Sequence, residues 1–203
     1  MFTIQPPLSI ATLSGLRPTQ ITVGYSEVER KQKKWAALKP SERKKKMREE
    51  LFPVVMGPHK RLYIIDHHHT ALAMLRESDG DVQVGLVKDL SDLSEASFWI
   101  FLDHNSWCHP YDARGHRTSF RAIPSELGEL HDDPFRSFAA DVRESGGYAK
   151  PMEPFLEFLW ANFFRNQLSR KLLEKHPRKA IEKALKLAKS PGAQHLPGWS
   201  GEK

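Results

Sequence analysis

The hydrophobic pattern alternates between strand-like and helix-like periods along the first half of the chain. Apolar and β-branched runs bounded by glycine and proline predict strands at residues 21–24, 52–56, 61–66 and 81–89. Runs with helical apolar spacing predict helices at residues 25–38, 41–51, 67–76 and 91–103. No internal repeat is visible, so these elements indicate one region that mixes strands and helices.

Polar residues at the start of three of these helices predict how each begins. Ser26 with Glu29 three residues later is the capping-box pattern for the first helix. Ser41 follows a Lys-Pro break and is expected to cap the second helix. For the fourth helix, Ser91 and Ser94 are alternative caps.

The pattern changes after residue 104. Residues 105–124 are polar and rich in turn formers, and three helices are predicted after them, at residues 134–145, 152–175 and 177–189. The last residues, 190–203, lack periodicity and are expected to pack as an extended tail. We therefore divide the chain into a domain at residues 1–133 and a helical C-terminal extension at residues 134–203.

Composition narrows the class of protein. The 203 residues are 39% hydrophobic and 28% charged, which excludes collagenous, membrane-spanning and wholly disordered chains. The single cysteine, Cys108, cannot form an internal disulfide, and we expect a buried small hydrophobe rather than a nucleophile. The first fifteen residues lack the basic start of a signal peptide. These features predict a cytoplasmic protein with no membrane partner.

The positive charge is concentrated in one stretch. The chain carries 31 Lys and Arg against 25 Asp and Glu, a net charge of +6, and the surplus lies between Arg30 and Glu50. Acidic residues are interspersed in this stretch, and it lacks a series of aromatic residues on which bases could stack. A solvated helical face is therefore a simpler interpretation than a nucleic-acid contact.

The junction between the predicted strand 61–66 and the following helix carries the most chemistry. Asp66, His67, His68 and His69 stand together where a strand end meets a helix N-terminus, a place that attracts phosphate groups. Adjacent helical residues point in different directions, so the three imidazoles cannot all ligate one ion. The simplest structural alternative is one capping histidine and a second that is packed under the sheet.

The same residues carry a family resemblance. Pro53-Val54-Val55, the turn after it and residues 62–73, LYIIDHHHTALA, resemble the ParB/sulfiredoxin superfamily and its ParB-like nuclease group. Upstream, residues 16–20 and the segment with Glu27 and Lys31 resemble the opening of the same group. The likeness covers about residues 14–105. It implies an α+β fold, a small mixed sheet with flanking helices, to which this chain adds the helical C-terminal extension.

The resemblance also implies a site at the junction. In the superfamily this position holds nucleotide phosphates, and Asp66, His68 and His69 match an Asp and two His of its kinase-like version. His67 stands where a glycine is usual, and Thr70 stands where an arginine holds phosphate. Glu27 matches an acidic residue of the first helix. No cysteine lies in the junction, which argues against sulfiredoxin chemistry.

These matches, together with a second cluster of polar and ionisable residues at 103–117, give each residue an expected role. His68 or His69 is expected to be the general base or a metal ligand, Asp66 to orient or ligate, and Glu27 to act as a second acid or base. The expected phosphate-binding residues are His67, Thr70, Lys31, Arg114 and Arg117. The expected ligands of Mg²⁺ or Mn²⁺, with Zn²⁺ as an alternative, are Asp66, His68, Asp103 and His104.

The predicted function is that of a ParB-like nuclease or a nucleotide-dependent enzyme, using ATP or CTP, with nucleotide or DNA as partner. Two alternatives stay open: a non-catalytic DNA- or protein-binding module, and a histidine-dependent enzyme acting on a small metabolite. No helix-turn-helix for operator recognition is evident. The aromatic run at residues 155–164 is expected to form core or a dimer face.

Overall fold

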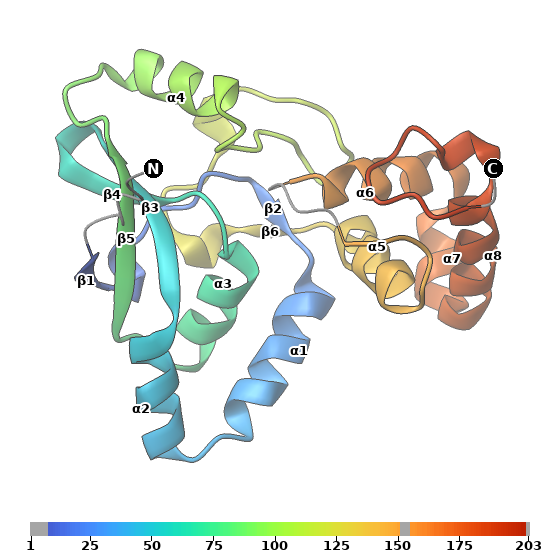
Figure 1. Cartoon of the computed structure of the whole chain (residues 1–203), viewed down its shortest axis with the longest axis horizontal. Helices are drawn as coiled ribbons and strands as arrows, with labels where there is room; N and C mark the ends of the chain where they lie inside the picture. Colours follow the sequence, from blue (N-terminus) through green and yellow to red (C-terminus); the bar gives the residue numbers. More distant parts are fainter. Residues whose placement is uncertain (1–7, 151–154, 202–203) are drawn as a thin grey trace, which may run out of the picture.

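A computed structural model describes residues 8–150 and 155–201 of the chain. Its main sheet has the strand order β1-β5-β3-β4 (Figure 1), formed by Leu8–Thr12, Asp81–Asp89, Leu51–Gly57 and Arg61–Ile64. The β5 and β3 strands are parallel, and β1 and β4 pair antiparallel at the two edges. The sheet is therefore mixed, as the family resemblance implied.

Helices pack on the sheet because its strands carry apolar side chains on both faces. On one face, Phe52, Val54 and Val84 are fully buried against α1 (Tyr25–Ala36) and α3 (His68–Glu77). Other strand residues pack against Phe98 and Leu102 of α4 (Glu95–His104). The basic helix α2 (Pro40–Glu49) buries no residue, which matches the expected solvated face.

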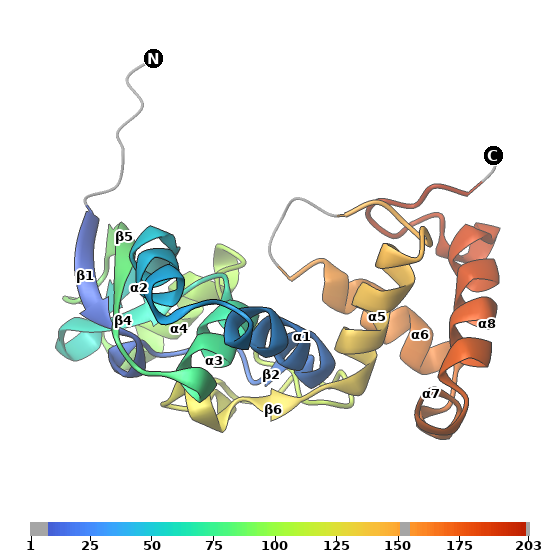
Figure 2. The same ribbon diagram turned by 90° about the horizontal axis from the view of Figure 1, so that it is seen from below.

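The C-terminal helices form a separate apolar cluster at the far end of the molecule (Figure 2). They are α5 (Pro134–Glu144), α6 (Glu157–Gln167), α7 (Arg170–Lys175) and α8 (Pro177–Lys189). The aromatic face of α6 is buried here, since Trp160 and Phe164 are fully covered by the chain itself. Those aromatic residues therefore serve as core.

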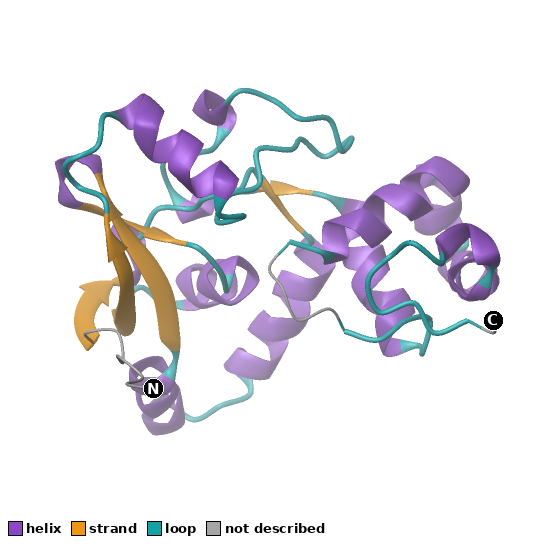
Figure 3. Ribbon diagram, turned by 45° about the horizontal axis from the view of Figure 1, so that its top comes forward, coloured by secondary structure: helices purple, strands orange, loops and turns teal. Residues whose placement is uncertain are grey.

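A short parallel pair links the two regions (Figure 3), formed by β2 (Thr22–Val23) and β6 (His131–Asp132). It brings residues from before α1 next to residues from before α5. The pattern of residues 131–132 is too short to indicate a strand, and β1 was also not predicted. Both strands are defined by their partners more than by their own sequence.

Three predictions about helix boundaries were wrong. Ser26 does not cap α1: the first N–H groups of that helix donate to distant side chains, Tyr25 to Asp132 Oδ1 at 2.8 Å and Ser26 to Ser137 Oγ at 3.1 Å. Lys39, rather than Ser41, occupies the N-cap position of α2. The partners of the α1 donors lie over a hundred residues away, where local spacing does not reveal them, whereas in α2 Glu42 accepts the N–H of Lys39 at 2.7 Å.

The third error concerns the single helix predicted over residues 152–175. Residues 152–154 lie outside the described residues, and the rest is two helices, because Leu168 is extended and Ser169 Oγ caps α7. Ser94, one of the two alternatives, caps α4. The C-terminal segment is less extended than expected, with a 3-10 turn at Pro191–Ala193.

Among the described residues, no helix has the length and apolar character needed to cross a bilayer.

Close approach of α5 to the start of α1 requires a glycine at position 24. A Cβ atom there would lie 2.7 Å from the backbone nitrogen of Ser137. Gly24→Ala should therefore lower the free energy of unfolding by about 1–3 kcal/mol, measured by urea denaturation. Gly128→Ala is the matched control, since a Cβ at Gly128 meets nothing within 4 Å. Equal stability of the two variants would contradict the proposed close packing.

Candidate functional site

A pocket of about 490 Å³ opens where β4 ends and α3 begins, and α1, α5 and α6 complete its walls. Six positively charged side chains line it, namely Arg30, Lys31, Lys34, Arg136, Arg143 and Lys150. Five carboxylates also line it, namely Glu27, Glu50, Asp66, Glu144 and Glu157. The pocket also contains His67, His68, His69 and Thr70, so the predicted junction is one wall of this pocket.

The turn into α3 is left-handed. His67 is the N-cap residue with φ of 65°, and Asp66 Oδ1 accepts the N–H of His67 at 2.6 Å. Few residues other than glycine adopt this conformation, and such residues concentrate at functional sites. The backbone N–H groups of the first helical residues have no partner within the helix, so they are available to an anion in the pocket.

His68 is a packed structural histidine. Its side chain is buried, and its Nε2 accepts the N–H of Thr19 at 3.1 Å. Burial lowers the pKa of His68 well below its usual value, so the imidazole is neutral at pH 7. With Nε2 occupied in this way, His68 is poorly suited to the predicted role of general base or metal ligand. The arrangement matches the alternative of a histidine packed under the sheet.

His69 is also neutral. Its Nε2 accepts the N–H of Gly24 at 3.0 Å, and burial, with a smaller effect of Arg136, lowers its pKa to about 3. The Oε2 atom of Glu27 lies 3.7 Å from the same nitrogen. A nitrogen of a neutral imidazole that accepts a hydrogen bond carries no proton to donate. His69 Nε2 therefore bonds to the Gly24 N–H and does not form an ion pair with Glu27.

Glu27 is held as an anion. Burial alone would raise the pKa of Glu27, but the charges of His69 and Arg136 outweigh burial and lower the pKa. Since His69 is neutral at pH 7, Arg136 is the effective partner, with 3.2 Å between Nη1 and Oε2. A carboxylate locked in this ion pair is a weak candidate for the expected second acid or base.

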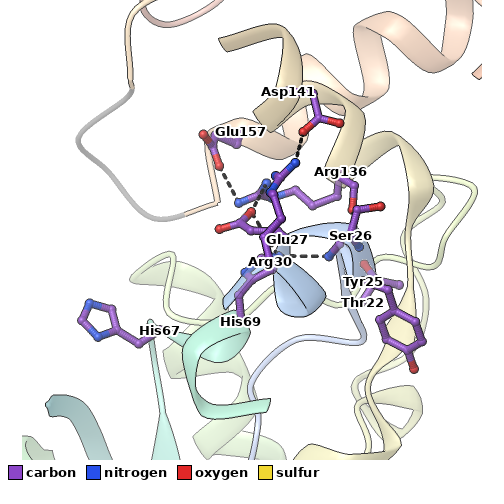
Figure 4. Close-up of polar contacts among 12 residues, drawn as sticks. Thr22, Tyr25, Ser26, Glu27, Arg30, His67, His69, Arg136, Asp141 and Glu157 are labelled. Atoms are coloured by element: carbon purple, nitrogen blue, oxygen red, sulfur yellow. Dashed lines mark hydrogen bonds and ion pairs between the residues drawn. The ribbon is translucent and has the colours of Figure 1, made fainter. Parts of the chain in front are cut away.

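Arg136 joins two walls of the pocket (Figure 4). Its guanidinium contacts Glu27 of α1 and also Glu157 of α6, with 2.5 Å between Nη2 and Oε2. Arg143 pairs with the same Glu157, and Arg30 of α1 pairs with Asp141 of α5. The network ties α1 to the C-terminal helices across the pocket.

His67 is the accessible histidine of the junction, and Figure 4 shows it apart from the Arg136 network. Its Nδ1 lies 3.5 Å from Glu50 Oε1. Contact with Glu50 raises the pKa of His67 despite partial burial, and the same contact lowers the pKa of Glu50. Among the three adjacent histidines, His67 therefore changes its charge nearest to neutral pH.

The second predicted cluster does not line the pocket. Arg117 Nη2 pairs with Asp103 Oδ2 at 2.5 Å, and His104 is exposed at the end of α4. Arg114 is exposed and lies 3.4 Å from Asp112. The structure thus does not bring these residues together with the junction. Cys108 is buried, and burial raises its pKa to about 12, so its thiol is protonated at pH 7.

The predicted metal ligands are correspondingly separated. Within residues 8–150 and 155–201, no three His, Cys, Asp or Glu side chains are arranged to hold a metal ion. Asp66 and His68 face the pocket, whereas Asp103 pairs with Arg117 outside it. The four predicted ligands therefore do not form one metal site, and binding of Mg²⁺, Mn²⁺ or Zn²⁺ stays a prediction.

Comparison with known proteins gives the family. Residues 9–166 match the family described as "Putative ParB-like nuclease". The chain belongs to the ParB-like nuclease family. It is also similar to the crystal structure of protein Atu1540 from Agrobacterium tumefaciens, at 43% sequence identity and a TM-score of 0.88, covering 98% of this chain and 100% of that one. No curated protein matches the sequence.

The ParB-like nuclease match extends beyond the resemblance at residues 14–105, through α5 and most of α6. Sequence reasoning missed the pocket residues of this part, Arg136, Arg143 and Glu157. Each occurs in an ordinary amphipathic helix, where a charged residue usually faces solvent. The extent of the family match is the one signal that could have included them.

Histidines that are held neutral in the folded chain predict that its stability falls in acid. In the folded chain His69 and His109 have pKa values of about 3, against 6.5 for an ordinary histidine. Protons therefore bind the unfolded chain more tightly, and the free energy of unfolding should fall as pH decreases from about 6.5 toward 3. His69→Gln should reduce that slope by about one proton, ~1.4 kcal/mol per pH unit, in urea denaturation at several pH values.

The exposed His104 at the end of α4 provides the control. His104→Gln should keep the wild-type slope. If His69→Gln keeps it as well, His69 is not held neutral in the folded chain.

Proposed function

We propose that this protein binds a phosphate group of a nucleotide or nucleic acid at the N-terminus of α3 and hydrolyses a phosphate ester there. The observation that carries the proposal is the left-handed turn at His67. It presents unpaired backbone N–H groups and an accessible imidazole to a pocket with six cationic side chains. Helix N-termini and cations both favour phosphate, and family membership supports phosphodiester chemistry.

The cations of the pocket divide into two groups. Arg136 and Arg143 are engaged by Glu27 and Glu157, and they form the walls. Lys31, Lys34 and Lys150 have no ion-pair partner within the described part of the chain. These lysines are the charges available to a phosphate, with Lys31 filling the role that the sequence assigned to it.

His67 supplies the proton transfer in this proposal. Glu50 orients the ring through Nδ1, which leaves Nε2 as the reactive atom, and the raised pKa keeps a protonated fraction near pH 7. Water attacks phosphorus and releases its proton to solvent, the bond from phosphorus to the leaving oxygen breaks, and Nε2–H protonates that oxygen. The role expected of His68 or His69 thereby passes to their neighbour, with Asp66 holding the turn.

Removing the imidazole should abolish turnover without unfolding the protein. Asparagine tolerates the left-handed region, so His67→Asn should keep the N-cap geometry and the melting temperature. We expect hydrolysis of a single-stranded oligonucleotide or of bis(p-nitrophenyl) phosphate to fall by about 10²–10⁴-fold. A His67→Asn variant that keeps the wild-type rate would overturn the assignment.

Glu50 provides a second test of His67, the pH dependence of the rate. A purely structural role of His67 would leave that pH dependence unchanged. A general acid is active when protonated, so the rate should decline as pH rises through the pKa of His67. Glu50→Gln removes the charge that raises this pKa and should shift the declining limb to lower pH. Phosphate binding with no turnover in any variant, wild type included, would instead support the non-catalytic binding module.

Phosphate binding should depend on Lys34 but not on its neighbour. Lys34 lines the pocket, whereas the exposed Lys33 on the same helix does not. Lys34→Ala should weaken binding of inorganic phosphate or an oligonucleotide about three- to tenfold, with a smaller salt dependence, in isothermal titration calorimetry. Lys33→Ala is the matched control. Equal losses in both would indicate a diffuse charge effect rather than a phosphate site.

A further inference from the structure

One aromatic side chain stands out in the charged pocket. Phe155 lines the pocket and has φ of 63°. For a bulky residue this backbone region is unfavourable and persists only where the surrounding structure imposes it. A large apolar ring is thus held in a hollow whose other lining groups are mainly charged.

Phe155 is only partly buried and lines the pocket, so a ligand there can contact it. His109 stacks beside it, with 5.4 Å between ring centroids and an interplanar angle of 17°. Its neighbour Phe158 has no such freedom, because His109 stacks on it at 3.9 Å and Arg136 lies 5.5 Å from its ring centroid. Burial lowers the pKa of His109 to about 3, so its ring is neutral. The uncharged ring packs flat against Phe155 and supports it.

A polar group with a fixed orientation lies in the same pocket. Gln20 is 3% exposed, and its Nε2 donates to Thr22 O at 2.7 Å. That bond fixes the amide, and within the described residues its oxygen Oε1 accepts no hydrogen bond. Gln20 lines the pocket, so a ligand with an N–H group can reach it.

We propose that Phe155 is the stacking platform for a nucleobase and that Gln20 accepts a hydrogen bond from the amino group of that base. The inference rests on the proposed function and names its substrate class, a nucleotide unit with an amino-bearing base. The ring of Phe155 lies 6.4 Å from that of His68, the first residue of α3. Phe155 therefore lies near the start of α3, and a nucleotide with its phosphate at the helix N-terminus can place its base against that ring. Base stacking on an aromatic side chain tolerates any base, so Gln20 supplies the selectivity.

The experiment compares ligands that share a phosphate. Binding of AMP, IMP and ribose 5-phosphate to the full chain is measured by isothermal titration calorimetry. AMP should bind about tenfold or more tightly than ribose 5-phosphate, and several-fold more tightly than IMP, which lacks the amino group. In Phe155→Gly the advantage of AMP over ribose 5-phosphate should disappear, while the affinity for ribose 5-phosphate stays unchanged.

Variant choice keeps the test independent of folding. Glycine adopts the left-handed conformation readily, so Phe155→Gly removes the ring without adding backbone strain. Phe155→Trp should keep the preference for AMP. Phe163→Leu is the matched control, since Phe163 lies in α6, the helix that follows Phe155, and does not line the pocket.

The outcomes separate this inference from the proposed function. Equal wild-type affinity for AMP and ribose 5-phosphate, or an equal loss of both in Phe155→Gly, overturns the stacking platform and leaves the phosphate site intact. Equal affinity for AMP and IMP overturns the role of Gln20. If the wild type binds neither inorganic phosphate nor ribose 5-phosphate, the proposed function itself fails.

Discussion

The ion pairs of Arg136 hold the pocket together. This nearly buried guanidinium bridges Glu27 of α1 and Glu157 of α6, so the sheet domain and the C-terminal helices share one wall. A buried charge is tolerated only when its partners stay in place, and loss of one partner leaves an uncompensated charge. The same contact keeps Glu27 ionised and helps to keep His69 neutral. Arg136 therefore contributes both to the packing of α1 against α6 and to the charge state of the pocket.

Three adjacent histidines illustrate how environment separates identical residues. His68 and His69 each accept a backbone N–H, from Thr19 and Gly24, and both are neutral because they are removed from water. These two bonds hold the segment before α1 against α3. His67 stays near solvent beside Glu50 and has a raised pKa. Two of the three histidines thus build the site, and the third is free to act in it.

The proposed phosphate site lacks the arginine that the family resemblance leads one to expect at position 70. Thr70 carries no charge, but Lys31 and Lys34 approach from α1, and Lys150 approaches from beyond α5. In the proposed site, these lysines from separate elements take the place of that arginine. Since Arg114 and Arg117 pair with nearby carboxylates outside the pocket, they do not take over this role.

The sequence by itself determined the strand-turn-strand-helix order, the phosphate-attracting junction at residues 66–69 and the ParB-like family, because these depend on local periodicity and on contiguous motifs. Only the tertiary structure decided which histidine is accessible, since Thr19 and Gly24 lie more than forty residues away from the side chains that they contact. It also decided that Arg136 and Phe155 belong to the site. Such residues look like ordinary helix surface or core until long-range packing places them at the pocket.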